Sequence, residues 1–446
     1  MKTNYPRRIL SFALFALLFT ACVGLEQTFT PPPPPQPIPN TFYIEPDFVV
    51  GPISPHIYGT NYGPWVTVPF DMWPYAETSG LTIIRFPGGE WGDMNTIRSY
   101  QLDQLVDFAN MMGADLSINV RLKNGDVATA LDLMKSVEND GYEVAYWGIG
   151  NEPTLYEGAL RESYDTERFN AEWREFALAM KEAYPDILLV GPEIHQFTGI
   201  PANNPKDASG RDWMTEFLKA NGDLVDIVSF HRYPFPRSRD ENATIPTLRE
   251  NTQEWDATFS YLRELMIEHV GQPLPIAITE INSHYTKAVD GEATPDSFYN
   301  AIWWADLLGR FIQNDVHMVN HWMLTSLGGQ GGAGLIGRSE VRPTYYVYQL
   351  YQRFGTDQVY ASSDDSYVTT TAALREDGTL TIMLVNLTDS PVTRPIQVGD
   401  APPSDANVWL LDADHMGENL GVQPIGDTIT LPAQSVTLLE IKSSEE

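Results

Sequence analysis

Two glutamates stand at the ends of short apolar runs that are typical of buried strands. Glu152 follows the run 144–150 (VAYWGIG), and Glu280 lies near the end of the run 275–282 (PIAITEIN). A carboxylate in such a place is costly to bury unless it is hydrogen-bonded or functional. Either glutamate alone could be a rim carboxylate paired with an arginine. Two at matching places indicate a functional pair, of the kind used in general acid–base or nucleophilic chemistry.

Eight apolar runs of this kind provide the elements that would position the pair. They cover residues 56–62, 81–87, 115–122, 144–150, 186–193, 226–233, 275–282 and 317–324. Helical patterns separate them, for example one that follows a possible N-cap at Thr166. The alternation predicts an α/β fold, a (β/α)8 TIM barrel over residues 56–355, with both glutamates at the active, C-terminal ends of strands. An open doubly wound sheet is disfavoured, because no glycine-rich phosphate loop follows the first run.

The pattern changes after a helix predicted over 344–354. Strand-like runs at 366–375 and 379–387 flank Asp377-Gly378, a hairpin signal, and further runs cover 408–413, 428–431 and 435–441. Glycine, proline and aspartate turns separate these runs. We therefore expect a C-terminal antiparallel β-sandwich domain over residues 356–446, into which an N-terminal strand within 41–55 pairs.

The N-terminal residues indicate export. Lys2, Arg7 and Arg8 precede an apolar run, which predicts a signal peptide over residues 1–21. The run ends Phe-Thr-Ala-Cys, and Cys22 is the only cysteine of the chain. This resembles a bacterial lipoprotein cleavage box, which implies a lipid anchor on Cys22; ordinary cleavage near residue 21 is the alternative. The proline-rich segment 22–40 is expected to be a stiff linker, so the protein would be a cell-surface lipoprotein or extracellular.

Composition excludes several classes of function. The chain has 59 acidic and 28 basic residues, a net charge of −31, which repels nucleic acid and anionic lipid surfaces. The histidines lack the spacing of a zinc helix, and no Gly-x-Ser-x-Gly elbow occurs. We therefore expect no catalytic metal and no cofactor, while a structural calcium in the β domain and the oligomeric state stay open.

Four motifs carry a resemblance to a known group of enzymes. They are RFPGGEW (85–91), GNEPTLY (150–156), FHRYP (230–234) and ITEIN (278–282). Together with the predicted barrel they resemble clan A glycoside hydrolases, and within that clan families 39, 44, 51 and 79. The resemblance covers essentially the whole chain after the linker, and it implies a carbohydrate substrate.

Residue by residue, the resemblance implies that Glu152 is the general acid/base and Glu280 the nucleophile of a retaining reaction. Asn151 would hydrogen-bond the sugar 2-hydroxyl, although it could instead satisfy loop backbone groups. Arg85 would keep the nucleophile ionised, or form a structural ion pair, or do both. A short carboxyl separation, about 5–5.5 Å, is expected for retention. Burial and the nearby nucleophile are expected to raise the pKa of Glu152.

Aromatic and polar residues at other strand ends are further candidates. The resemblance implies that His231 and Tyr233 contact the nucleophile or the substrate, and that Trp322 is the platform for a sugar ring, with core packing as the alternative. Residues that could line subsites or merely build loops are Asn61, Glu90, Trp91, Asn282 and His284.

A second class of function remains open, namely a catalytically silent carbohydrate-binding lipoprotein on the same fold. Such a protein would be expected to have lost one of its two glutamates. Because Glu152 and Glu280 are both present, the sequence favours an enzyme.

Overall fold

The computed structural model describes residues 33–235, 243–403 and 405–442. The expected signal peptide, Cys22 and most of the proline-rich linker lie outside the described residues. The fold discussed below lies within residues 35–446. Among the helices of the described part, none combines the length and the hydropathy needed to span a bilayer.

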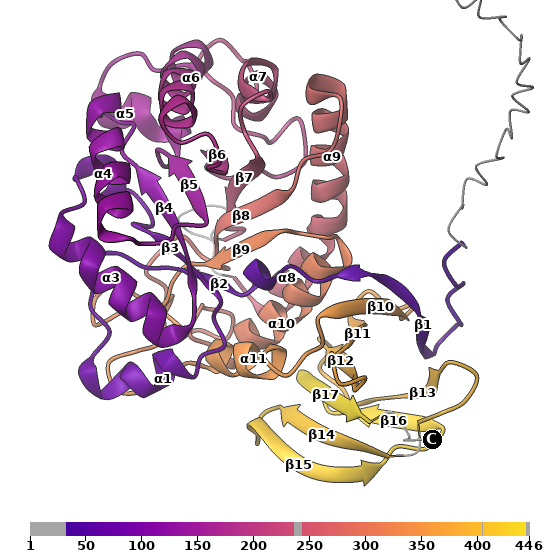
Figure 1. The fold of residues 1–446 in the computed structure, drawn as a ribbon. Coiled ribbons are helices and arrows are strands. Elements are labelled where there is room, and N and C mark those ends of the chain that lie inside the picture. Colours follow the sequence, from indigo (N-terminus) through magenta and orange to yellow (C-terminus); the bar gives the residue numbers. More distant parts are fainter. Residues whose placement is uncertain (1–32, 236–242, 404, 443–446) are drawn as a thin grey trace, which may run out of the picture. The chain divides into compact units, whose positions relative to one another are not determined.

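The predicted barrel is confirmed. Eight parallel strands close into a barrel in sequence order (Figure 1): β2 (Gly59–Asn61), β3 (Ile83–Phe86), β4 (Asp115–Val120), β5 (Tyr146–Ile149), β6 (Leu189–Ile194), β7 (Ile227–Arg232), β8 (Ile276–Ile281) and β9 (Met318–His321). Each strand lies within one of the eight apolar runs, or overlaps it to within one residue. The runs are rich in apolar residues because the barrel strands are covered on both faces.

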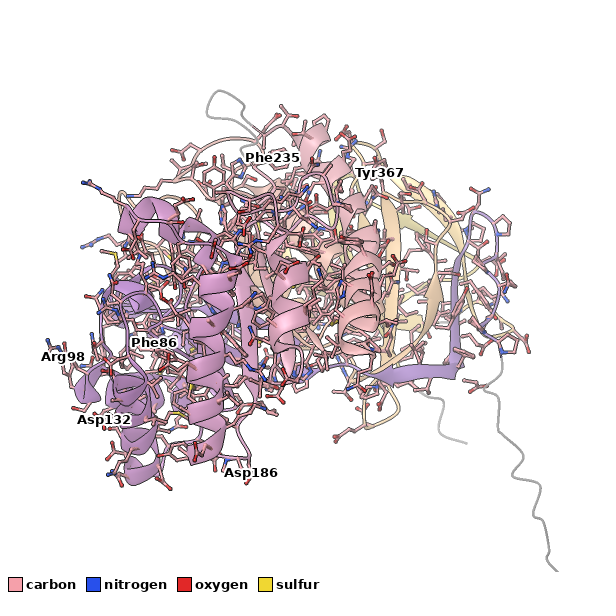
Figure 2. The ribbon with its side chains drawn as sticks, turned by 90° about the horizontal axis from the view of Figure 1, so that it is seen from above. Phe86, Arg98, Asp132, Asp186, Phe235 and Tyr367 are labelled. Carbon is pink, nitrogen blue, oxygen red and sulfur yellow. The ribbon has the colours of Figure 1, made fainter. Side chains whose placement is uncertain are left out.

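Helices follow the strands: α1 (Trp73–Glu77), α2 (Trp91–Met94), α3 (Ser99–Met112), α4 (Val127–Asp140), α5 (Tyr156–Leu160), α6 (Thr166–Ala183), α7 (Trp213–Asn221), α8 (Ile245–Asn251), α9 (Trp255–Val270), α10 (Phe298–Gln313) and α11 (Pro343–Tyr351). In Figure 2, Arg98, Asp132 and Asp186 lie at the periphery, whereas Phe86 is buried. The N-cap expected at Thr166 is wrong by one residue. Asp165 caps α6, because its carboxylate accepts from the Arg168 amide at 3.0 Å.

The barrel interior changes from apolar to polar along its axis. Ile83, Tyr146, Val190, Ile227, Ala277 and Met318 form one buried cluster inside the barrel. Two residues further along β3, β7 and β8 stand Arg85, Ser229 and Thr279, which are also fully buried. Since side chains alternate with a period of two, the same inward face that is apolar at the start of a strand becomes polar toward its end. A buried polar layer of this kind needs internal partners, which the site supplies.

The expected β domain is a sheet of nine strands in the order β15-β14-β17-β12-β11-β10-β1-β13-β16. Their bounds are β1 (Phe42–Pro52), β10 (Asp357–Ser362), β11 (Val368–Leu374), β12 (Leu380–Asn386), β13 (Val392–Val398), β14 (Asp405–Leu411), β15 (Met416–Pro424), β16 (Thr428–Leu431) and β17 (Ser435–Ile441). Side chains from both ends of this order, including Ile44, Ile396 and Val408, share one core, as in a sandwich. β1 pairs antiparallel with β10 and parallel with β13, which is the one parallel pair between these strands.

Helix α10 joins the barrel to this sheet. Its residues from Tyr299 to Ile312 are buried, and it packs against β11 and β12. Within the helix, Arg310 donates to Asp306 at 2.7 Å, and the Thr369 hydroxyl of β11 donates to the same carboxylate at 2.5 Å. Asp306 is therefore a buried, ion-paired carboxylate that lies outside the site described next.

Candidate active site

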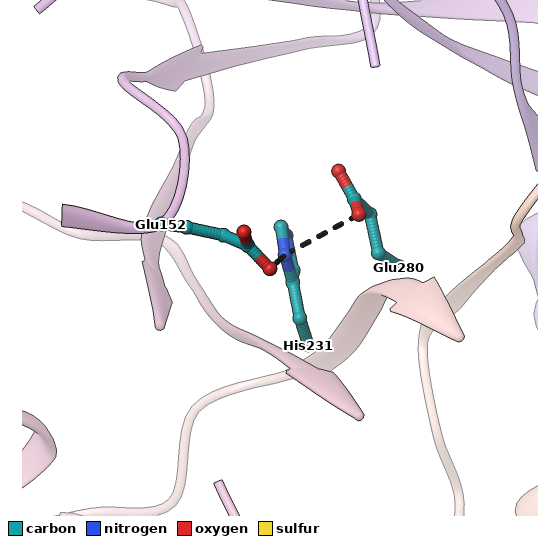
Figure 3. A group of neighbouring side chains, drawn as sticks. All are labelled: Glu152, His231 and Glu280. Carbon is teal, nitrogen blue, oxygen red and sulfur yellow. Dashed lines mark hydrogen bonds and ion pairs between the residues drawn. The ribbon is translucent and has the colours of Figure 1, made fainter. Parts of the chain in front are cut away.

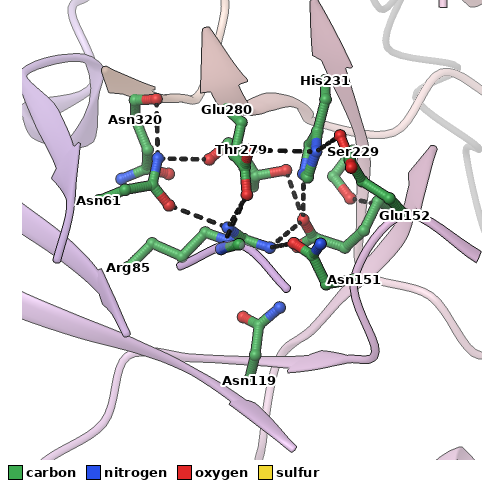
Figure 4. Close-up of polar contacts among 12 residues, drawn as sticks. Asn61, Arg85, Asn119, Asn151, Glu152, Ser229, His231, Thr279, Glu280 and Asn320 are labelled. Atoms are coloured by element: carbon green, nitrogen blue, oxygen red, sulfur yellow. Dashed lines mark hydrogen bonds and ion pairs between the residues drawn. The ribbon is translucent and has the colours of Figure 1, made fainter. Parts of the chain in front are cut away.

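The C-terminal ends of β3, β5, β6, β7 and β8 bring five ionisable side chains together: Arg85, Glu152, Glu193, His231 and Glu280. Figure 3 shows Glu152, His231 and Glu280, and Figure 4 shows these three with Arg85. Two of the glutamates have an unusual backbone conformation. Glu152 has φ 47° and Glu193 has φ 60°, in the left-handed region that non-glycine residues seldom adopt. Backbone strain of this kind is concentrated at functional sites, where the surrounding structure holds it in place.

Arg85 donates hydrogen bonds to four other side chains of the site. Its Nη1 donates to Glu280 Oε1 and to Asn61 Oδ1, each at 2.9 Å. Its Nη2 donates to Glu193 Oε2 at 2.8 Å and to Asn151 Oδ1 at 2.9 Å. The side chain is fully buried, so both ion pairs lie in a low-dielectric environment where charge interactions are strong. One guanidinium thus orients two carboxylates and two amides (Figure 4).

Glu280 is held at both carboxylate oxygens. Besides Arg85, its Oε1 accepts from the Gly89 backbone amide at 2.9 Å, and its Oε2 accepts from the Tyr233 hydroxyl at 2.8 Å. Burial and the nearby carboxylates keep the pKa of Tyr233 well above 10, so its hydroxyl stays a donor. Gly89 is required here, since its φ is +64° and a Cβ would come within 2.5 Å of the Trp322 ring.

Glu152 faces two imidazoles. His195 Nδ1 and His231 Nδ1 lie 2.7 and 3.0 Å from its Oε1. Burial by itself raises the pKa of Glu152, but the hydrogen bonds and charges of these two histidines outweigh it and hold the pKa below its ordinary value. The expectation of a raised pKa is therefore wrong. That expectation considered the effects of burial and of the neighbouring glutamate on the pKa. It did not include the two imidazoles, which only the folded chain brings next to this carboxylate oxygen.

His231 bridges the two sides of the site. Its Nδ1 faces Glu152 Oε1 and lies 3.6 Å from Glu280 Oε2, while its Nε2 lies 2.8 Å from Glu193 Oε2. Burial lowers its pKa, but the three carboxylates raise it more, to about 9. The ring is therefore an imidazolium at neutral pH, and both of its nitrogens donate.

The two glutamates named from the sequence approach each other closely. One carboxylate oxygen of Glu152, one of Glu280 and a His231 nitrogen lie within 4.8 Å of one another (Figure 3). Three such donors could hold a metal ion, but each is already paired, and the adjoining Arg85 guanidinium and His231 imidazolium would repel a further cation. The arrangement suits proton transfer and nucleophilic attack better than metal binding.

Trp322 stands at the edge of this cluster. Its ring is stacked on that of Trp65, with centroids 5.8 Å apart and planes 20° apart, and both side chains are partly exposed. The Asn282 side chain donates to the Trp322 carbonyl at 2.5 Å, which fixes the backbone of the platform. Two partly exposed aromatic rings beside paired carboxylates form an apolar surface at the edge of the site.

Several residues proposed as subsite candidates are used within the protein instead. The Asn61 amide accepts from Arg85 and donates to the Thr279 carbonyl at 2.9 Å, and Asn282 is fully buried. The polar atoms of Asn61 and Asn282 are already hydrogen-bonded within the protein, so both residues position other groups. His284 is buried against Ser283, and burial lowers its pKa to about 4. Glu90 is exposed and Trp91 is partly exposed, and among the described residues no hydrogen bond or ion pair joins the side chain of either to the five ionisable groups.

Four contributors to the site were not predicted as site residues: Trp65, Gly89, Glu193 and His195. A signal did exist for one of them, because Glu193 ends the fifth predicted run as Glu152 and Glu280 end theirs. His195 stands in a loop whose position only the fold determines. Trp65 lies in the loop after β2 and is recognised only by its stacking on Trp322.

Replacing Arg85 should destabilise the protein strongly. Arg85→Met removes the cationic partner of two buried carboxylates, those of Glu193 and Glu280, and we expect the free energy of unfolding to fall by about 3–5 kcal/mol at neutral pH. The loss should shrink as the pH is lowered, because the stranded carboxylates then take up protons. Arg174→Met, which breaks an exposed pair with Asp223, is the control and should cost less than about 1 kcal/mol. Urea unfolding followed by tryptophan fluorescence measures both, and equal losses would contradict the role given to Arg85.

The fold resembles that of a known class of proteins. A (β/α)8 barrel with a glutamate at the ends of its fourth and seventh strands, β5 and β8, has the architecture of clan A glycoside hydrolases. Solved structures confirm this resemblance for the fold. A bifunctional glucanase–xylanase from a metagenome library superposes with a TM-score of 0.69 at 17% identity, covering 92% of this chain and 100% of that one. A family 51 α-L-arabinofuranosidase from Bifidobacterium longum gives 0.69 at 17% identity, over 91% and 100%. A family 44 endoglucanase from Clostridium thermocellum gives 0.69 at 16%, over 90% and 99%.

Sequence comparisons point the same way. The chain is 24% identical over 306 residues to heparanase of Bos taurus, covering 65% of this chain and 51% of the bovine protein. It is 24% identical over 297 residues to heparanase of Rattus norvegicus, covering 63% and 50%. The chain thus spans about half the length of the curated relatives it matches. Residues 365–438 match the family model of the D-apionate lactonase C-terminal immunoglobulin-like domain.

Proposed function

We propose that this protein is a retaining glycoside hydrolase that cleaves O-glycosidic bonds of an oligo- or polysaccharide by double displacement. The observation that carries the proposal is the pair Glu152 and Glu280: one carboxylate oxygen of each lies within 4.8 Å of the other, and the two side chains have different surroundings. The Glu280 carboxylate accepts hydrogen bonds from Arg85, Gly89 and Tyr233, as suits an anion. Glu152 Oε1 instead lies within hydrogen-bond distance of two imidazoles, those of His195 and His231. Inverting enzymes need a wider gap, about 6.5–9.5 Å, to admit a water.

In the first step the Glu280 carboxylate attacks the anomeric carbon as the glycosidic C–O bond breaks. Glu152 gives its proton to the leaving oxygen, which departs as an alcohol. At neutral pH the proton is held by the pair of Glu152 and His231, and it reaches Glu152 Oε1 across their 3.0 Å contact. The product of this step is an ester between Glu280 and the sugar.

In the second step a water replaces the alcohol. Glu152 takes a proton from this water, the resulting hydroxide bonds to the anomeric carbon, and the ester C–O bond breaks to restore the Glu280 carboxylate. Two inversions give net retention. The Asn151 amide oxygen accepts a hydrogen bond from Arg85. The Nδ2 donors of Asn151 therefore remain for the sugar 2-hydroxyl.

The substrate class rests on the relatives and on the platform formed by Trp65 and Trp322. The relatives are named as glucanase, xylanase, arabinofuranosidase and heparanase, so the proposal is limited to a carbohydrate. We further propose that the mature protein acts outside the cell, exported by its N-terminal segment and anchored through Cys22. Labelling with a radioactive fatty acid, lost in Cys22→Ser, tests the anchor.

Release of reducing sugar from a panel of plant, microbial and animal glycans tests the enzyme. We expect cleavage of at least one member, abolished in a Glu152→Gln, Glu280→Gln double variant that still folds. Binding of a glycan without cleavage across the panel would favour the silent carbohydrate-binding alternative and overturn the proposed function.

A further inference from the structure

Glu193 is a third buried carboxylate, and the double displacement described above gives it no step. It ends β6, and its side chain is only 1% exposed. A single oxygen, Oε2, accepts three hydrogen bonds: from Arg85 Nη2 at 2.8 Å, from His231 Nε2 at 2.8 Å and from the Thr279 hydroxyl at 2.7 Å. Its backbone amide donates to the Ser229 hydroxyl at 3.0 Å, and its carbonyl accepts from the Glu152 amide at 3.1 Å.

The site contains more negative than positive charge. Glu152, Glu193 and Glu280 face two buried cations, Arg85 and His231. Burial alone raises the pKa of Glu193, but Arg85 and His231 outweigh burial and hold the pKa below its ordinary value, so Glu193 is an anion. A third buried anion beside two catalytic carboxylates is expensive, which calls for a reason why the chain has a glutamate and not a glutamine there.

His231 supplies that reason. The groups in contact with its ring are three carboxylates, those of Glu152 after β5, Glu193 on β6 and Glu280 on β8. The other titratable or charged side chains around it bind these carboxylates: His195 contacts Glu152, Arg85 contacts Glu193 and Glu280, and Tyr233 contacts Glu280. Glu193 is the carboxylate that contacts Nε2, on the side of the ring away from Glu152. It therefore fixes a proton on Nε2 and directs Nδ1 toward the general acid/base.

We propose that Glu193 is a positioning residue whose negative charge keeps His231 protonated, so that the proton Glu152 delivers is stored on Nδ1 of that ring. This inference rests on the proposed function and deepens it. Glu193 touches neither the substrate nor the reacting atoms. It acts through His231, much as a carboxylate orients and charges a histidine in other hydrolases. Glu193 also accepts a hydrogen bond from Arg85, whose guanidinium donates to Glu280 as well.

Glu193→Gln isolates the charge. The amide oxygen can keep all three hydrogen bonds now made to Oε2, while the negative charge is removed. Without that charge the imidazolium is less stable, so His231 should lose its proton at lower pH, by about 1–2 pH units. The basic limb of the kcat/KM profile, which reports loss of the proton shared by Glu152 and His231, should move down by a similar amount.

Two measurements on the full chain test this. NMR of protein labelled with ¹⁵N-histidine follows the titration of all eight histidines, with His231→Gln used for assignment. The kcat/KM profile is then recorded on a substrate found in the glycan panel. Asp306→Asn is the matched control, since Asp306 is also buried and paired with an arginine, but on α10. We expect it to lower stability and leave both the His231 titration and the pH profile unchanged.

A His231 titration in folded Glu193→Gln that matches the wild type would overturn the inference, as would a titration that shifts while the basic limb stays fixed. If Glu193→Gln does not fold, Thr279→Val provides the test. Loss of the hydroxyl donor leaves the Glu193 charge less neutralised, so His231 should titrate higher by about 0.3 unit; no change or a lower value contradicts the proposal. The NMR result needs no substrate, so a shifted titration in a protein that cleaves no glycan supports the charge coupling and rejects the proposed function alone.

Discussion

Glu280→Ala should abolish cleavage of every substrate, including those with activated aryl leaving groups. The residue supplies the bond to the sugar in the first step, and neither acid catalysis nor a better leaving group replaces that bond. Loss of the nucleophile of a covalent mechanism costs nearly as much as loss of the whole machinery, so we expect kcat/KM to fall by about 10⁵-fold or more. Initial rates on an aryl glycoside measure the loss.

Azide should restore turnover in this variant. The small anion fits the space that the carboxylate vacates and attacks the anomeric carbon, which gives a glycosyl azide of inverted configuration. Glu138→Ala is the control, because this exposed carboxylate lies near the C-terminal end of α4 and accepts a hydrogen bond from the Tyr184 hydroxyl, at 3.3 Å. It should change kcat/KM only slightly. NMR of the first sugar released by the wild type gives the decisive check, since an inverted product would make Glu280 a base.

Glu152→Ala should separate substrates by their leaving groups. A poor leaving group needs the proton that Glu152 delivers, so kcat/KM should fall by about 10²–10⁴-fold. An activated aryl group departs without that proton, and its kcat/KM should be nearly unchanged. Its kcat should still fall, because water attack on the glycosyl ester has lost its base, and the ester should accumulate as a burst of released aryl alcohol.

The pH profile of Glu152→Ala provides a second measurement. On the activated substrate the basic limb of kcat/KM should disappear, because the reaction no longer needs the proton held by Glu152 and His231. Equal losses on poor and activated leaving groups would show that Glu152 does not act as the acid. A basic limb that persists unchanged would assign that proton to another group.

Local pattern accounted for most of the fold. The alternation of apolar runs with helical patterns was enough to predict the closed barrel, because strand and helix periods are properties of neighbouring residues. The hairpin at Asp377-Gly378 followed from turn chemistry, and Gly378 does have φ 79°. Strands β10, β13 and β15 were missed, since their exposed or half-buried residues show no clear alternation and pairing with neighbours decides their conformation.

The position of the two glutamates was also readable, but their orientation was not. Thr279 and Glu280 are adjacent, and a regular pleat would point them to opposite faces. Both nevertheless reach the site, because the pairing of β7 with β8 and of β8 with β9 shifts register at this point. Such bulges redirect side chains beside active sites, and no local signal in the sequence predicted this one.

The sequence by itself determined which strands form the barrel and which of their ends carry carboxylates. Only the tertiary structure decided how those carboxylates are charged. Glu152 meets His195 and His231, which are 43 and 79 residues away in the chain, and Glu193 meets Arg85 across 108 residues. Electrostatic energy depends on the distances between such groups and on their burial, and neither quantity is a property of neighbouring residues. The sign of the pKa shift at Glu152 was therefore beyond the reach of sequence pattern.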